Sequence, residues 1–213
     1  MILRLAAILA LLAGTALARE ERGAAPGDFD FYVLALSWSP AFCELEGGDR
    51  DREQCRPGRR LGFVVHGLWP QSERGYPSYC GADRFVPRAV LSEAEGLYPS
   101  EGLARYQWRK HGTCAGTSPS GYFRDVRRAY EALRIPNELA DGSAQRLPPL
   151  AIERAFGREN PGLRPDMMSV ACRRGVLQEV RICIEKDLRG FRSCPEVDRA
   201  GCRISDIDIP SPR

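Results

Sequence analysis

Imidazole groups are scarce in this chain of 213 residues, which contains only two histidines, His66 and His111. The sequence also has no Cys-x-x-Cys pair, a spacing typical of structural zinc sites. The arrangement nearest to a zinc pair is His111-x-x-Cys114, and a zinc ion would need two further ligands. We therefore expect no bound metal ion.

Signature motifs of several enzyme classes are also missing. The sequence has no Gly-x-Ser-x-Gly nucleophile elbow, no P-loop and no dinucleotide-binding fingerprint. These absences argue against a serine hydrolase with that elbow, a P-loop NTPase and a nicotinamide-dependent enzyme. A cysteine hydrolase would need a free thiol, whereas the cysteines of this chain are better explained as disulfides. We expect no cofactor.

A strong net charge is absent as well, since the formal net charge of the whole chain is +3. Bulk charge therefore does not indicate a nucleic-acid binder, and any anion-binding site must be local. Nearly all cations are arginine, because Lys110 and Lys186 are the only lysines.

A long apolar run occurs only at the amino terminus. Residues 1–18 combine Arg4, an apolar run over residues 5–13 and a small-x-small site at residues 16–18, as a secretory signal peptide does. The alternative is a membrane anchor, but the run is too short to span a bilayer and no stop-transfer pattern follows. We expect cleavage after Ala18 and export to a periplasm or the cell exterior, with no membrane contact after cleavage.

Eight cysteines follow the predicted signal peptide, and an even number in an exported chain indicates disulfides rather than a metal site. The residues alone leave about 105 connectivities open.

Strands and helices alternate irregularly along the chain. Apolar, β-favouring segments at 29–40 and 61–70 predict buried strands, and partial alternation at 176–188 predicts a late strand. Ser118 and Pro119 match a helix N-cap followed by proline at the first helical position. This mixture indicates an α+β fold.

The domain organisation that we predict is simple. A weaker second helix is expected at 147–160, and neither an internal repeat nor a long linker divides the chain. Residues 19–27 are polar and contain Gly23, Pro26 and Gly27, which predicts a flexible leader. Residues 28–213 then form a single domain.

The two histidines lie in similar surroundings. His66 stands in VVHGLWP and His111 in WRKHGTC; each precedes a glycine and has a tryptophan within three positions. A lone histidine is more often a packing residue than a catalyst, but two in such motifs can perform concerted acid–base chemistry. RNA cleavage uses one group to deprotonate the ribose 2′-OH and another to protonate the 5′ oxygen. Lys110 is the candidate cation for the phosphoryl oxygens, and Trp69 and Trp108 are candidates to stack or pack near the RNA.

The segments HGLWP and WRKHGTC, in this order, resemble the two active-site segments of the ribonuclease T2 family, which are secreted, acid-leaning endoribonucleases with little base specificity. YVLALSWSPAFC resembles the first strand of that family, and LQEVRICIEKDL resembles its late strand. The resemblance extends from about Phe29 to Cys202. It implies an α+β fold in which helices pack on a central antiparallel sheet.

The resemblance also implies roles for individual residues. His111 matches the general base, His66 the general acid, Lys110 the cation that stabilises the phosphorane, and Trp69 a residue that lines the substrate site. Single-stranded RNA would yield 2′,3′-cyclic phosphates and then 3′-phosphates, and DNA, which lacks the 2′-OH, would not be cleaved. The family's disulfide pattern would join Cys43 to Cys55, Cys80 to Cys114, Cys172 to Cys202 and Cys183 to Cys194.

The sequence departs from the family pattern at two site positions. Tyr106 and Gln107 stand where the family usually has His-Glu, a phosphate-binding histidine and a glutamate that supports the base or the transition state. Gln107 keeps the size and hydrogen bonding of glutamate but does not ionise, so we expect an active enzyme with a shifted rate or pH dependence. Ser37 and Gln71 occupy positions where some relatives have base-contacting residues, so base preference is not predicted.

A second hypothesis is a secreted RNA- or protein-binding member of the same fold with weakened catalysis. Only Tyr106 and Gln107 favour it, whereas the retention of both histidines favours the enzyme. We expect a monomer that acts on RNA.

Overall fold

The computed structural model of the chain describes residues 19–46, 51–82, 85–140 and 142–212. The predicted signal peptide, residues 1–18, lies outside the described residues. Within the ranges described, no helix has the length and apolar character needed to cross a membrane.

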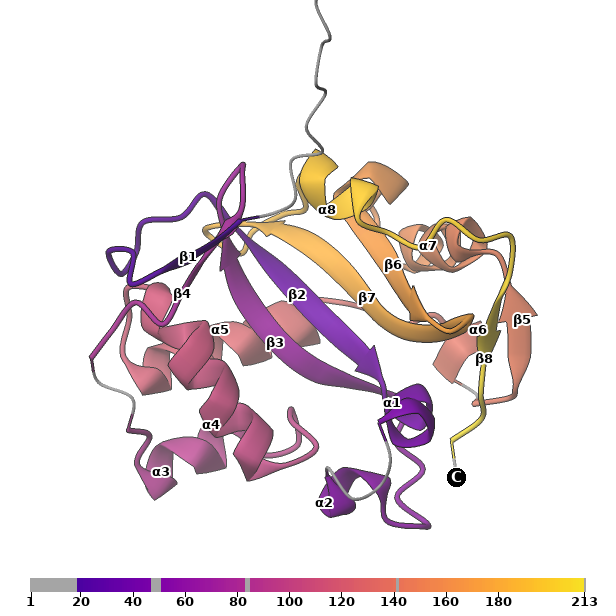
Figure 1. The fold of residues 1–213 in the computed structure, drawn as a ribbon, viewed down its shortest axis with the longest axis horizontal. Coiled ribbons are helices and arrows are strands. Elements are labelled where there is room, and N and C mark those ends of the chain that lie inside the picture. The colour runs from indigo at the N-terminus through magenta and orange to yellow at the C-terminus, as the bar shows by residue number, and fades with distance from the viewer. Residues whose placement is uncertain (1–18, 47–50, 83–84, 141, 213) are drawn as a thin grey trace, which may run out of the picture.

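The chain folds into a central sheet with helices around it (Figure 1). The strands are β1 (Glu20–Arg22), β2 (Phe31–Trp38), β3 (Phe63–Gln71), β4 (Tyr76–Ser78), β5 (Gln145–Leu147), β6 (Met168–Arg173), β7 (Val176–Glu185) and β8 (Ile207–Ile209). The helices are α1 (Ser39–Leu45), α2 (Arg52–Cys55), α3 (Arg88–Leu91), α4 (Glu101–Lys110), α5 (Pro119–Glu131), α6 (Asn137–Ala140), α7 (Pro149–Glu159) and α8 (Pro195–Arg199), with 3-10 turns at Ser92–Ala94, Gly112–Cys114 and Pro165–Met167.

The central sheet has the strand order β3-β2-β7-β8-β5, with β6 also paired to β7. The pairs β2–β3, β2–β7, β6–β7 and β5–β8 are antiparallel, and β7 meets β8 in a short parallel contact. The predicted α+β fold with a mainly antiparallel sheet is therefore confirmed.

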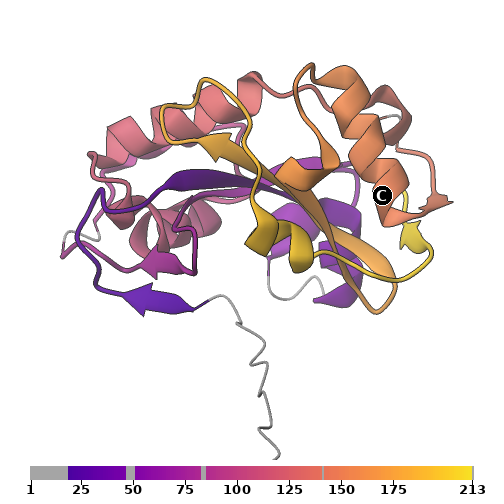
Figure 2. The ribbon, with the colours of Figure 1, turned by 90° about the horizontal axis from the view of Figure 1, so that it is seen from above.

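The two faces of the sheet differ in what covers them. Figure 2 shows α5 and α7 along one face and α8 on the opposite side. Alternate side chains of a strand point to opposite faces. Tyr32, Leu34 and Leu36 of β2 therefore join the main core beneath α5 and α7, whereas Phe31 and Val33 belong to a smaller cluster near α8. Trp69, a predicted substrate-site residue, packs against this smaller cluster and so lies on the second face of the sheet.

A β-bulge lies at His66. Along the β2–β3 pair, Ala35 is opposite Gly67 but Leu36 is opposite Val65, so His66 is an extra residue without a partner on β2. Bulges change the direction of a side chain locally and are common beside active sites.

The predicted helix at Ser118 is confirmed as α5. The Ser118 side chain accepts a hydrogen bond from the Gly121 N–H at 3.1 Å, and Pro119 is the first helical residue. The Tyr122 hydroxyl on the buried face donates to the Leu68 carbonyl of β3 at 3.0 Å. This bond fixes α5 against the strand that carries His66.

Residues 19–27 differ from the flexible leader that the composition predicted. Glu20–Arg22 form β1, which pairs in parallel with Tyr76–Ser78 of β4. The Lys186 ammonium donates to the carbonyls of Gly27 at 2.9 Å and Phe29 at 2.8 Å. Backbone contacts therefore hold this segment, and composition alone does not reveal them.

The eight cysteines form four disulfides, in the same pairs that the resemblance implies. Such a set indicates an oxidising compartment. The Cys80–Cys114 bond ties the start of the loop after β4 to the turn that follows His111, and the Tyr79 N–H also donates to the Lys110 carbonyl at 2.8 Å.

Candidate active site

A cleft of about 310 Å³ lies where β3 meets the carboxyl end of α4. It brings together two segments that are far apart in the sequence, and Figure 1 shows α4 beside β3. On its far side the cleft is bounded by Arg181 of β7 and by Glu196 and Val197 of α8. The predicted site residues that line the cleft are His66, Trp69, Gln71, Tyr106, Gln107, Lys110 and His111.

The Trp69 ring contacts both imidazoles. Its centroid lies 5.3 Å from that of His111, in a stacked arrangement with an interplanar angle of 26°. The His66 ring meets Trp69 edge-on, with the centroids 5.2 Å apart and an angle of 80°. Both proton-transfer candidates are therefore held against one aromatic ring in one cleft.

His111 forms the C-cap of α4 and is only 5% exposed. Its Nδ1 atom is buried and has no hydrogen-bond partner among the described residues. The end of a helix favours a cation, but burial has the larger effect. Burial, together with the neighbouring Lys110 and His66, holds the pKa of His111 well below its usual value of 6.5. His111 is therefore a neutral imidazole at neutral pH, as a general base must be.

His66 lies in the opposite kind of environment. Its Nδ1 atom is hydrogen-bonded to the carboxylate of Glu179, a residue of β7 that is only 5% exposed. The second carboxylate oxygen accepts a hydrogen bond from Arg181 Nε at 2.9 Å, and Nη2 of the same guanidinium lies 2.8 Å from it in an ion pair. Burial alone would raise the pKa of Glu179, but the hydrogen bond and charge of His66 and the charge of Arg181 lower that pKa to about 2. The carboxylate is thus ionised.

Neither Glu179 nor Arg181 belongs to the site residues predicted from the sequence. The available signal was the alternation in VLQEVRIC, which places these two residues on the same face of a predicted strand as Leu177. In that pattern a glutamate occupies a position on a buried face. A buried glutamate is rare unless it has a partner, so the position indicates a paired carboxylate.

Gln107 is buried beneath the cleft, with 1% of its surface exposed, and its Oε1 accepts from Trp69 Nε1 at 2.8 Å. Gly67 makes room for this bond, because a Cβ at Gly67 would lie 2.2 Å from Gln107 Oε1 and 2.3 Å from Trp69 Nε1. Gln107 therefore orients the ring that separates the two histidines.

The cations of the cleft come from two elements. The Lys110 ammonium lies 5.9 Å from the centroid of the Tyr76 ring, and the Arg181 guanidinium lies 5.5 Å from that of Trp69. With Glu196 as the one acidic residue in the described lining, the cleft provides a local anion site in a nearly neutral chain.

Two predicted substrate contacts lie elsewhere. Trp108 is 3% exposed and packs in the main core, where its ring centroid lies 5.8 Å from that of Tyr122. Trp108 is not part of the described lining of the cleft, and its burial in the core indicates a packing role. Ser37 lines a separate pocket of about 220 Å³, which borders His66 on its other side.

The glycine after His111 is required by packing. A Cβ at Gly112 would lie 2.4 Å from Trp108 Cε3 and 3.0 Å from Tyr122 Cδ1, both in buried rings. We predict that Gly112→Ala lowers the free energy of unfolding by about 1–3 kcal/mol through overpacking, measured by urea denaturation. In the control Gly102→Ala, in α4, the new Cβ would meet only Ser100 Oγ at 3.9 Å. That variant should gain up to about 1 kcal/mol, and equal losses in both variants would contradict the packing argument.

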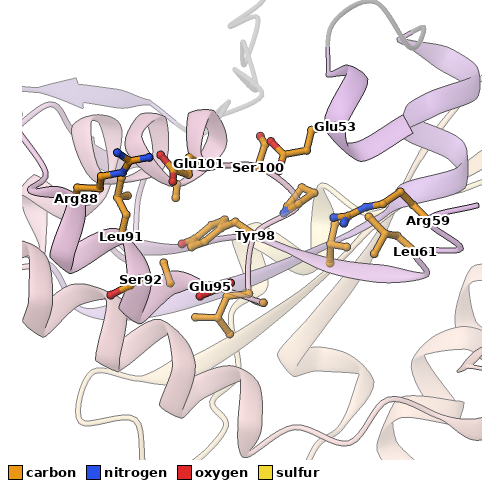
Figure 3. A pocket seen from close by; sticks show the side chains of 16 residues that line it. Glu53, Arg59, Leu61, Arg88, Leu91, Ser92, Glu95, Tyr98, Ser100 and Glu101 are labelled. Carbon is orange, nitrogen blue, oxygen red and sulfur yellow. The ribbon is translucent and has the colours of Figure 1, made fainter. Parts of the chain in front are cut away.

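A larger cavity, of about 580 Å³, lies away from both histidines (Figure 3). Its charged side chains are Arg59 and Arg88 against Glu53, Glu95 and Glu101, so acidic groups outnumber cations. This cavity therefore suits a phosphodiester less well than the cleft of the histidines.

Comparison with known proteins identifies the family of the chain. The sequence matches the model of the ribonuclease T2 family over residues 29–194. A ribonuclease of Aeromonas hydrophila is 39% identical over 186 residues, which cover 80% of this chain and 78% of the relative. Ribonuclease I of Escherichia coli is 29% identical over 209 residues, covering 76% and 77%. The structure of RNase NT in complex with 5′-AMP superposes with a TM-score of 0.67 at 20% identity, covering 87% of this chain and 98% of that one.

Proposed function

The chain belongs to the ribonuclease T2 family, and from this premise we propose that it is an endoribonuclease that cleaves single-stranded RNA by metal-independent acid–base catalysis. The observation that carries the proposal is the contrast between the two imidazoles of the cleft. His111 is buried without a partner for Nδ1, whereas His66 is bonded to an ionised carboxylate. Two titratable groups in such different environments are suited to be the base and the acid of one reaction.

In the first step, neutral His111 takes the proton of the ribose 2′-OH. The 2′ oxygen then attacks phosphorus, the bond from phosphorus to the 5′ oxygen breaks, and His66 gives its proton to that departing oxygen. The product is a 2′,3′-cyclic phosphate. In the second step water attacks phosphorus with the two roles reversed, which opens the ring to a 3′-phosphate.

The remaining residues of the cleft act on charge and orientation. Lys110 supplies a cation beside the general base, and it offsets the negative charge that grows on the phosphoryl oxygens in the transition state. Trp69 holds the two imidazoles apart, and Gln107 holds Trp69. The Tyr106 hydroxyl, which shares a hydrogen bond with Tyr79 on the exposed rim, can also hydrogen-bond a phosphate.

The reaction needs a 2′-OH, which provides a direct test. An oligodeoxynucleotide with one internal ribonucleotide should be cut once, directly 3′ of that ribose. The matched oligonucleotide in which this residue is a deoxynucleotide should stay intact. Cleavage of the fully deoxy strand would overturn the proposal.

Gln107→Glu is predicted to shift the pH dependence. The new carboxylate lies one helical turn before His111, favours the protonated imidazole and so raises the pKa of the base. Because the base must be unprotonated, kcat/KM falls as the pH drops through this pKa. We expect the acid limb of the pH–kcat/KM profile to lie below pH 6.5 in the wild type and roughly one unit higher in the variant.

The control for this experiment is Gln107→Leu, which removes the bond to Trp69 without adding charge. It should lower the rate but leave the acid limb where it is. An unchanged profile for Gln107→Glu would show that this position does not act on the base.

The proposed location is a periplasm or the cell exterior. The four disulfides and the predicted signal peptide support it. We further propose that the enzyme acts as a monomer with low base specificity.

A further inference from the structure

We propose that Glu179, held by Arg181, is a positioning residue for His66: it fixes the imidazole with Nδ1–H on the carboxylate and Nε2 toward the cleft, where the leaving 5′ oxygen receives its proton. This inference rests on the proposed function, because it assumes that His66 is the general acid.

Both oxygens of the Glu179 carboxylate are engaged. One bonds to His66 Nδ1, and the other accepts a hydrogen bond from Arg181 Nε and forms an ion pair with the same guanidinium. A carboxylate buried to this degree is costly unless it is paired and hydrogen-bonded. The pairing leaves the carboxylate one orientation, and this orientation fixes the imidazole ring.

The cavities on the two sides of His66 show which nitrogen faces the substrate. Glu179 lines the pocket of about 220 Å³ and is not part of the described lining of the cleft, whereas His66 lines both. The imidazole ring thus lies between the carboxylate and the cleft. With Nδ1 turned to the carboxylate, Nε2 is the nitrogen left to serve the cleft.

The sheet is built to allow this contact. His66 is on β3 and Glu179 on β7, with β2 between them, so their backbones are about 10 Å apart. The β2 residues opposite Arg181 and Glu179 are Ala35 and Ser37, whose side chains are small. The bulge at His66 turns its ring toward this gap. A large side chain at Ala35 or Ser37 would fill the space through which the Glu179 side chain contacts His66.

Arg181 has a second contact that links the pair to the cleft. Its guanidinium lies over the Trp69 ring, 5.5 Å from the centroid, and it lines the cleft. Arg181, Glu179, His66 and Trp69 therefore form one connected group. His111 also contacts Trp69, but its Nδ1 atom has no partner among the described residues, which distinguishes the base from the acid.

The test compares two substrates on the same protein sample. A dinucleoside phosphate has an alkoxide leaving group that needs a proton, whereas uridine 3′-(p-nitrophenyl phosphate) releases an aryloxide that does not. We expect Glu179→Gln to lower kcat on the dinucleoside phosphate roughly 10- to 100-fold and to change kcat on the aryl ester less than about threefold. Because both assays use one sample, the ratio of the two losses does not depend on the folded fraction.

Three further variants complete the experiment. His66→Ala should show the same split between substrates, and adding Glu179→Gln to it should cause no further loss. Glu179→Asp should restore part of the rate on the dinucleoside phosphate. The control is Glu185→Gln, an exposed glutamate of the same strand, which should behave as the wild type.

The outcomes separate the two proposals. Equal losses on both substrates, or no loss, in Glu179→Gln would overturn the positioning role. If instead His66→Ala loses equally on both substrates, the assignment of His66 as general acid fails, whatever Glu179 does.

Discussion

Replacing His111 by alanine lowers kcat for RNA by roughly 10²- to 10⁴-fold, the range expected when a general base is removed. The environment of His111 makes this the decisive position: it is buried, stacked on Trp69 and held neutral. The variant should lose some stability, because the cavity left beside Trp69 is only partly offset by the removal of a buried Nδ1 atom that has no partner among the described residues. Initial rates on single-stranded RNA and urea denaturation measure the two effects.

The control for His111→Ala is Gln178→Ala, a partly exposed position on β7 beside the smaller pocket. It should keep more than half of the wild-type rate. If His111→Ala retains a tenth of the activity or more, another group is the base. Any biological effect that survives in an inactive His111→Ala protein belongs to binding, which is the second hypothesis of the sequence analysis.

The second large effect is expected from removal of the Cys80–Cys114 disulfide by a double substitution with serine. The bond spans 34 residues of sequence, and loop entropy gives it about 4 kcal/mol of stability. It also anchors the turn that directly follows His111. We therefore expect a lower free energy of unfolding and, in addition, a lower kcat for the fraction that remains folded.

The matched control is the Cys43–Cys55 disulfide, which spans 12 residues and lies away from the cleft. Its removal should cost about 3 kcal/mol by the same entropy argument and leave kcat per folded molecule unchanged. If both double variants lose kcat equally, the disulfide beside His111 has no special role in placing the base.

The three longest strands and the two longest helices were predictable from local patterns. The segments at 29–40, 61–70 and 176–188 contain β2, β3 and β7. Their continuous apolar or alternating residues are a strong signal for buried strands. The helix α5 begins at the predicted Ser118–Pro119 start, and α7 falls within the predicted segment 147–160. The four disulfide pairs required the family resemblance, because the spacing of cysteines alone leaves the connectivity open.

The helix α4 was not predicted, although it carries most of the second motif. Its buried residues Ala104, Gln107 and Trp108 follow helical spacing, but one of them is a polar glutamine that contacts Trp69 of β3. A polar residue on the buried face interrupts the apolar stripe by which an amphipathic helix is recognised in a sequence. Local reasoning likewise could not decide whether a tryptophan of the motif packs or binds, and Trp108 packs.

The contact between His66 and Glu179 could not be predicted from the sequence. The two residues are 113 positions apart, and they meet only because the sheet places β2 between their strands and a bulge turns the histidine. Neither the strand order nor the bulge has a signal in a single sequence. The histidine itself was predictable from its motif, but its partner was not.

The most direct test of the central claim uses oxidised protein without residues 1–18. It is incubated with single-stranded RNA in excess EDTA across about pH 4 to 8, and the new ends are identified by mass spectrometry. Two histidines acting as base and acid predict 2′,3′-cyclic phosphate ends first and 3′-phosphate ends later, at rates that EDTA does not change. Cleavage that EDTA abolishes, or ends that carry a 5′-phosphate, would contradict the two-histidine account.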